Sequence, residues 1–250
     1  MICSMNCAMP EFFVPDWPAP ANVRAMQTLR TGGCSVKPWD SFNLGDHVGD
    51  DAGCVAANRE ALRRFLPGEP FWLRQVHGIA AVDVNFCPIL PEADAAFSRQ
   101  PGRVCAVMTA DCLPVLFCDR AGSVVAAAHA GWRGLLAGVL EETIRSMAVP
   151  AADLLAWLGP AIGPRAFEVG DEVRAAFVAR DPEAAEAFAP HSSGKWLADI
   201  YLLARQGLCA AGVSEISGGT RCTACEKVAF FSYRRDGVTG RMASLIWLEA

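Results

Sequence analysis

Cys112 and His129 are the residues whose types and spacing most clearly point to chemistry. Cys112 stands just before one short apolar run and His129 just after the next, and the loop 119–122, which ends in glycine, joins the two runs. A four-residue loop of this kind is typical of a β-hairpin. Pairing Cys118 with Ser123 would place Cys112 opposite His129, with Cβ atoms about 4.5–5.5 Å apart. A slip of one residue would instead put the two side chains on opposite faces.

His77 offers a third member, because it also follows a short apolar run and precedes a glycine. Two imidazoles and a thiolate suit zinc, and three protein ligands leave a fourth position open, as in catalytic zinc sites. A histidine at a strand end is more often only hydrogen-bonded, so spacing alone leaves this interpretation open. Without a metal, Cys112 and His129 would instead be a thiolate nucleophile and its base, as in Cys/His hydrolases.

Charged residues near these three could hold a substrate or move a proton. Arg133 lies in the glycine-containing run 129–134 between a strand and a helix, where backbone N–H groups and the helix N-terminus attract anions such as phosphate. Arg235, in an arginine-rich tail around residue 237, is a second candidate. Both features are also common for steric reasons or on solvated surfaces. Asp111 is the nearest carboxylate that could shuttle protons, although a regular strand would point it away from Cys112.

The composition excludes several classes of protein. The 250 residues carry a formal charge of −5 and no basic run, which argues against a nonspecific nucleic-acid binder or a polybasic membrane clamp. No apolar run reaches the roughly 18 residues of a transmembrane helix. Four histidines are too few for a multicopper cluster, but they allow one mononuclear site of zinc or copper.

The 11 cysteines are predicted to be reduced and the protein cytoplasmic. Their number is odd, several lie in apolar segments, and the first residues carry no Lys or Arg of a secretory signal. Cys222 and Cys225 form an isolated CxxC motif. Because it lacks a second pair, a structural zinc is not predicted there.

The elements that must position these residues mix strands and helices. Apolar runs predict strands at 23–29, 71–76, 80–84, 103–108, 113–118, 123–128, 154–158, 215–217, 230–233 and 241–248. Periodicity and end signals predict helices at 52–65, 131–147, 172–179 and 197–211. Residues 1–10 look like a loose lead-in. No repeat or linker follows, so residues 11–250 are predicted to form one α/β domain.

Several long motifs follow one another from about residue 13 to residue 248. They are Phe42-Asn43-Leu44-Gly45 with His47-Val48-Gly49-Asp50, Gln75-Val76-His77-Gly78, Ala110-Asp111-Cys112-Leu113-Pro114-Val115, and the segments 129–134 and 230–241. Together they resemble the YfiH/laccase-domain family. Its members have been called polyphenol oxidases, peptidoglycan editing factors and purine nucleoside phosphorylases.

The resemblance implies a four-layered α/β/β/α fold and a zinc site at His77, Cys112 and His129. It also implies phosphorolysis of adenosine, guanosine, inosine and methylthioadenosine, with adenosine deamination as a second reaction. Asn43 and His47 could contact the base or the ribose. The expected partners are purine nucleosides and phosphate, with no nucleic acid or membrane, and the expected state is a monomer. The polyphenol oxidase label would require copper at the same site.

Cys225 departs from the family pattern, which suggests only Cys222. Two alternatives to zinc chemistry stay open. The fold resembles that of bacterial toxin deamidases with a Cys/His pair, so a metal-free, amidase-type hydrolase acting on peptidoglycan precursors is the first. A non-catalytic partner protein with a relic pocket is the second, and the intact set of three ligands argues against it.

Overall fold

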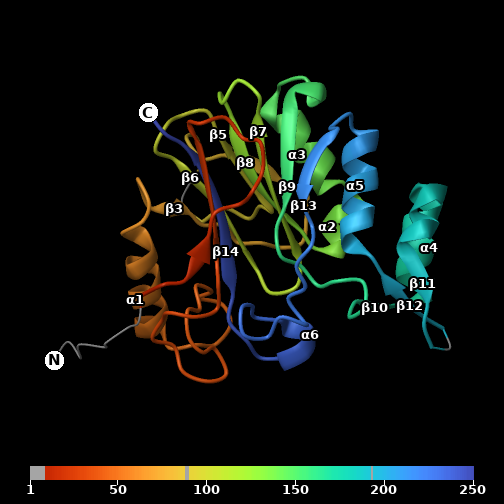
Figure 1. Cartoon of the computed structure of the whole chain (residues 1–250), viewed down its shortest axis with the longest axis horizontal. Helices are drawn as coiled ribbons and strands as arrows, with labels where there is room; N and C mark the ends of the chain where they lie inside the picture. The colour runs from red at the N-terminus through yellow and green to blue at the C-terminus, as the bar shows by residue number, and fades with distance from the viewer. Residues whose placement is uncertain (1–8, 88–89, 193) are drawn as a thin grey trace.

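Two β-sheets stacked face to face organise the computed structural model, which describes residues 9–87, 90–192 and 194–250 (Figure 1). The first sheet contains, in order, β1 (Phe12–Phe13), β2 (Val23–Thr28), β14 (Met242–Leu248), β6 (Val104–Thr109) and β3 (Pro70–Phe71). The second contains β13 (Glu215–Gly218), β9 (Leu154–Leu158), β7 (Leu113–Asp119), β8 (Val125–Ala130), β5 (Ala95–Ser98) and β4 (Ala81–Asp83). A small third sheet contains β10 (Glu168–Gly170), β12 (Lys195–Ala198) and β11 (Phe188–Pro190).

Helices cover the outer face of each large sheet. Helix α1 (Ala52–Arg63) packs on the first sheet, and α2 (Trp132–Ala137), α3 (Val139–Met147) and α5 (Ile200–Ala210) pack on the second (Figure 1). Helix α4 (Asp171–Arg180) lies beside the small sheet, and α6 (Tyr233–Asp236) is a single turn. Short 3₁₀ helices span Ala151–Asp153 and Pro182–Ala187. This order of layers confirms the expected α/β/β/α arrangement in one mixed α/β domain.

The core explains why β7 reads as an uninterrupted apolar run. Every residue of this strand is buried, because its two faces meet different layers. Val115 and Phe117 belong to the apolar cluster under the helices, whereas Leu116 and Cys118 belong to the cluster between the two sheets. Strands covered on both faces lose the alternation of polar and apolar residues that marks a half-buried strand.

The predicted hairpin exists, but its predicted register is wrong by two residues. His129 pairs with Pro114 rather than Cys112, and Cys118 pairs with Val125. The connection is longer than expected because the Asp119 carboxylate accepts N–H groups from Ser123 and Val124 and so organises a wider loop. A slip of two residues preserves the face on which each side chain lies. Cys112 and His129 therefore still converge.

Three other predicted elements differ from the structure. The helix predicted at 131–147 is broken at Gly138, whose φ of 105° belongs to the left-handed region. The strand predicted at 230–233 is wrong: Phe230 and Phe231 are fully buried, yet they lie in a loop that leads into α6. Of the strand predicted at 71–76, only β3 pairs in a sheet. The lead-in predicted at 1–10 falls mostly outside the described residues.

Within the part of the chain that the structure describes, no helix has the length and apolar character needed to cross a membrane.

Candidate metal centre

His77, Cys112 and His129 come together into one cluster. Their ligand atoms all lie within 4.8 Å of one another, and within the described ranges this is the single group of three or more residues that could hold a metal ion. Cys112 Sγ is 3.8 Å from His77 Nε2, and the two imidazole rings meet edge to face with centroids 4.8 Å apart. Two imidazoles and a thiolate are a donor set that zinc and copper both accept.

Three different segments position these ligands. His129 is the penultimate residue of β8, and Cys112 immediately precedes β7. His77 lies in an exposed loop with a left-handed φ of 59°. Gly131, the N-cap of α2, passes so close that a Cβ there would lie 2.8 Å from His77 Cδ2 and 3.0 Å from Cys112 Sγ. A glycine is therefore needed where the helix approaches the cluster.

Asp94 is a site residue that the sequence reasoning missed. Its fully buried carboxylate lies 2.8 Å from His129 Nδ1 and accepts the backbone N–H groups of Val76, His77 and Gly78. The bond to Nδ1 leaves His129 Nε2 to face the cluster, as in the carboxylate–histidine–metal arrangement of zinc proteins. In the sequence, Asp94 stands between Ala93 and Ala95, immediately before β5. A carboxylate inside such an alanine run was the signal available.

The electrostatics of the metal-free cluster favour a charged pair. Burial alone would raise the pKa of the Cys112 thiol, but His129 and His77 lower it to about 6. Burial alone would lower the pKa of His129, but the Cys112 thiolate and the Asp94 carboxylate raise it to about 9. A thiolate is also the form of cysteine that binds a metal.

Two cavities meet at the cluster and share His77, Cys112, Ala110 and Tyr233. The first, of about 270 Å³, has an apolar wall and two arginines; its other lining residues are Asp111, Trp132, Arg133, Ile162, Phe167, Ile200 and Arg234. The second, of about 380 Å³, is more polar; its other lining residues are His47, Gln75, Met108, Thr109, His129 and Arg241. The cluster is thus reachable from both spaces.

Asp111 faces the first cavity, contrary to what a regular strand would give. Its φ of 97° takes the backbone out of the regular strand conformation just before Cys112, and both residues line this cavity. One oxygen accepts the Thr223 hydroxyl and the other accepts the Arg234 N–H, both at 2.6 Å.

The structure brings two of the four predicted substrate-binding residues to the cavities. Arg133 lines the first, with its guanidinium 4.6 Å from the ring centroid of its neighbour Trp132. His47 lines the second, where burial and Arg241 lower its pKa.

The other two predicted residues bond to neighbouring protein groups and line neither cavity. Buried Asn43 bonds Gly45 and Asp50 through its amide nitrogen and accepts the backbone N–H of Arg241 at 2.8 Å. The Arg235 guanidinium donates to the carbonyls of residues 223, 224 and 230 and pairs with Asp236. The tail arginines that line the cavities are Arg234 and Arg241 instead. Spacing along the chain could not show which arginines of this tail line the cavities.

Comparison with known proteins finds relatives that belong to one family. A family model described as multi-copper polyphenol oxidoreductase laccase matches residues 24–249. A purine nucleoside phosphorylase of Pseudomonas aeruginosa is 57% identical over 242 residues, covering 96% of this chain and 100% of its own. The purine nucleoside phosphorylase YfiH of Escherichia coli K12 is 58% identical over 243 residues, with the same coverage.

Solved structures agree with these relatives. The crystal structure of protein NMB0706 from Neisseria meningitidis is 54% identical, with a TM-score of 0.93, and the match covers 96% of this chain and 99% of that one. That of YlmD from Geobacillus stearothermophilus is 31% identical, with a TM-score of 0.88 and coverage of 97% and 100%. The chain therefore belongs to the YfiH/laccase-domain family, whose curated members include enzymes named purine nucleoside phosphorylase.

Proposed function

We propose that this protein is a zinc-dependent purine nucleoside phosphorylase for adenosine, guanosine, inosine and methylthioadenosine, with adenosine deamination as a second reaction. The observation that carries the proposal is the meeting of a three-ligand cluster with two arginine-lined cavities. The names of the relatives support nucleoside and phosphate as substrates. The acidic composition argues against nucleic acid and membranes as partners. The proposal takes the protein to be a cytoplasmic monomer.

His77, Cys112 and His129 would hold the metal through two imidazole nitrogens and a thiolate. When bound, zinc with an open position acts as a Lewis acid and lowers the pKa of a bound water to roughly 7. Asp94 fixes the ring orientation of His129 and the loop that carries His77. One metal per chain also fits the single described ligand group better than the several coppers in the family's description.

In phosphorolysis, a phosphate oxygen attacks the anomeric carbon of the ribose. The bond to the purine nitrogen breaks, and the purine leaves with the bonding electrons and takes up a proton. Arg133, Arg234 and Arg241 supply positive charge for phosphate, and the Trp132 and Phe167 side chains offer an apolar wall for the purine. We propose Asp111 as the carboxylate that exchanges this proton; it lines the first cavity and accepts the Thr223 hydroxyl and the Arg234 N–H.

One observation favours a second candidate function. The lowered pKa of Cys112 and the His129 ring beside it are what a metal-free Cys/His hydrolase needs, in the amidase-type chemistry of peptidoglycan-precursor editing. In that case Cys112 would attack a carbonyl carbon and His129 would protonate the leaving amine. A mononuclear copper site with polyphenol oxidase activity would use the same three ligands.

A metal analysis coupled to a product screen separates these functions. Protein purified without added metal is incubated with inosine and adenosine, with and without phosphate, and tested for ribose 1-phosphate and ammonia. We expect about one zinc per chain and ribose 1-phosphate only when phosphate is present. Folded Cys112→Ala protein should lose both zinc and phosphorolysis. Full phosphorolysis by that variant would contradict the proposal. Protein that holds no metal as purified and whose Cys112 alkylates rapidly in that state would favour the hydrolase.

A further inference from the structure

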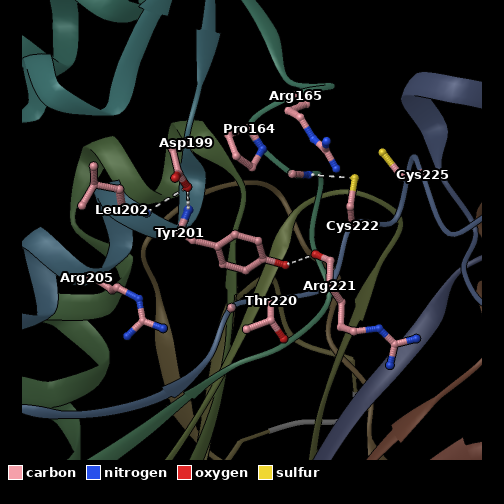
Figure 2. A pocket seen from close by; sticks show the side chains of 12 residues that line it. Pro164, Arg165, Asp199, Tyr201, Leu202, Arg205, Thr220, Arg221, Cys222 and Cys225 are labelled. Carbon is pink, nitrogen blue, oxygen red and sulfur yellow. Dashed lines mark hydrogen bonds between the residues drawn. The ribbon is translucent and has the colours of Figure 1, made fainter.

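A third cavity, of about 410 Å³, is shown in Figure 2. Gly163 and Tyr201 line it, and their chain neighbours Ile162 and Ile200 line the first cavity. The lining of the third cavity includes three arginines, Arg165, Arg205 and Arg221, and both thiols of the CxxC motif, Cys222 and Cys225. None of these five residues lines the cavities that meet at Cys112.

The two thiols sit in one tight turn. The N–H of Glu226 donates to the carbonyl of Cys222 at 2.9 Å, so the chain folds back within the CxxC segment. Cys222 is half-buried and Cys225 is exposed, and neither is in a disulfide. Within the described residues, the one group that could hold a metal is the His77 cluster, so this pair has no third ligand of that kind.

The contacts give the two sulfurs different roles. Cys222 Sγ accepts the backbone N–H of Gly163 at 3.3 Å, a bond that stabilises a thiolate (Figure 2). The hydrogen bond between the two thiols holds the pKa of Cys225 above its ordinary value. Cys225 therefore stays protonated to a higher pH than an ordinary cysteine. Cys222 is placed to attack, and Cys225 is placed to resolve.

The cavity is cationic around this pair. Arg205 donates to the carbonyls of Ile216 and Gly218 and makes no ion pair with a carboxylate of the described residues, whereas Arg221 pairs with Glu226 at 2.6 Å. The Asp199 carboxylate is engaged as the N-cap of α5. Arg165 lies at the same end of the cavity as the two sulfurs (Figure 2). A negatively charged ligand is favoured beside them.

We propose that Cys222 and Cys225 form a redox-active dithiol site that reacts with an anionic, low-molecular-weight disulfide such as glutathione disulfide. The Cys222 thiolate attacks one sulfur of that disulfide, the sulfur–sulfur bond breaks, and one thiolate leaves. Cys225, after losing its proton to solvent, then attacks the mixed disulfide at Cys222. A Cys222–Cys225 disulfide forms and the second thiolate leaves, so two protein thiols are oxidised and one small disulfide is reduced.

The test measures how the full-length protein, purified under reducing conditions, reacts with two disulfides. One is glutathione disulfide, and the other is the uncharged bis(2-hydroxyethyl) disulfide; the products are located by differential alkylation and peptide mapping. We expect a Cys222–Cys225 peptide that has lost two hydrogens. Cys225→Ser should instead trap a glutathione mixed disulfide at Cys222. Modification of exposed Cys209 with Cys222 and Cys225 still reduced would overturn the proposal.

Arg165→Gln tests the role of charge. We expect the rate with glutathione disulfide to fall about threefold or more, and the rate with the uncharged reagent to fall less, because only glutathione disulfide is attracted electrostatically. Arg145→Gln, an exposed arginine on α3 outside the cavity, is the matched control and should change neither rate. Equal rates of wild type and Arg165→Gln with glutathione disulfide would contradict an anionic ligand.

Discussion

At the scale of single residues, Asp94 links two of the three ligands. One carboxylate orients the His129 ring and accepts three successive backbone N–H groups of the loop that carries His77. Burial alone would raise the pKa of Asp94, but the His129 bond and the N–H donors lower it. The carboxylate therefore stays ionised at neutral pH, where its negative charge stabilises a protonated His129 Nδ1.

Asp94→Asn should weaken metal binding about 10- to 100-fold, because removing the outer carboxylate of a ligating histidine costs this much in zinc proteins. The measurement is zinc affinity by competition with a chelator, with unfolding followed in parallel. Asp119→Asn is the matched control: Asp119 is also a buried carboxylate that accepts loop N–H groups, but it contacts no histidine. Unchanged zinc affinity in Asp94→Asn would mean that Asp94 only holds the loop.

Alkylation of Cys112 in metal-stripped protein should follow an unusual pH profile. The thiolate is the reactive form, so the rate should rise as pH increases through about 6 and then level off. Cys118, whose pKa burial raises to about 12, should stay unreactive and serves as an internal control. Peptide mapping after short pulses of iodoacetamide gives the rate at each site. A midpoint near 8.5, the ordinary value for cysteine, would contradict the charged pair.

At the scale of elements, the start of α2 brings its backbone against the metal ligands. Gly131→Ala would put a methyl group 2.8 Å from His77 Cδ2 and 3.0 Å from Cys112 Sγ. Because the φ of −61° at this position suits alanine, the effect should come from displaced ligands and not from backbone strain. We expect at least about a tenfold loss of zinc affinity, since a metal site tolerates errors of only a few tenths of an ångström.

The control for this variant is Gly207→Ala in α5, where a new Cβ would meet nothing within 4 Å. Alanine should stabilise the helix by about 0.5–1 kcal/mol and leave zinc affinity unchanged. Wild-type zinc affinity in Gly131→Ala would show that the cluster can shift without cost.

The elements also show what the sequence could and could not predict. Local signals predicted α1 well, because Pro67 and Gly68 follow its end. The structure adds that Asp51 caps its start by accepting the N–H of Cys54. They could not separate the buried Phe230 and Phe231 loop from a strand, since both read as short apolar runs. The hairpin register depended on side-chain bonds of Asp119 that spacing does not reveal.

The site was predictable to the same limited depth. The three ligands follow from residue type and position, and they converge as expected. Asp94 was not predicted, because its role depends on β5 pairing with β8, two strands far apart in the chain. The predicted substrate contacts of Asn43, His47, Arg133 and Arg235 stay predictions.

At the scale of the whole molecule, an apolar layer between the two large sheets holds them together. Leu116 is fully buried in it and belongs to the apolar cluster between the sheets. Leu116→Ala should lower the free energy of unfolding by about 2–5 kcal/mol through lost burial and a residual cavity. Urea unfolding measures this cost, and exposed Val14→Ala should change stability by less than about 0.5 kcal/mol. A loss below 1 kcal/mol would mean that the sheets repack around the gap.

The position of β14 has a consequence for how the protein is made. This strand lies between β2 and β6 in the first sheet, yet its Ser244 is 217 residues beyond the Gln27 to which it bonds. While the ribosome is still adding the intervening chain, β2 and β6 have no partner on that side. In the second sheet, β13 is the last strand to be synthesised, and it lies at the edge of the sheet rather than between two earlier strands. The nascent protein thus exposes two open strand edges until β14 emerges, and this is the interval in which chaperones would be needed.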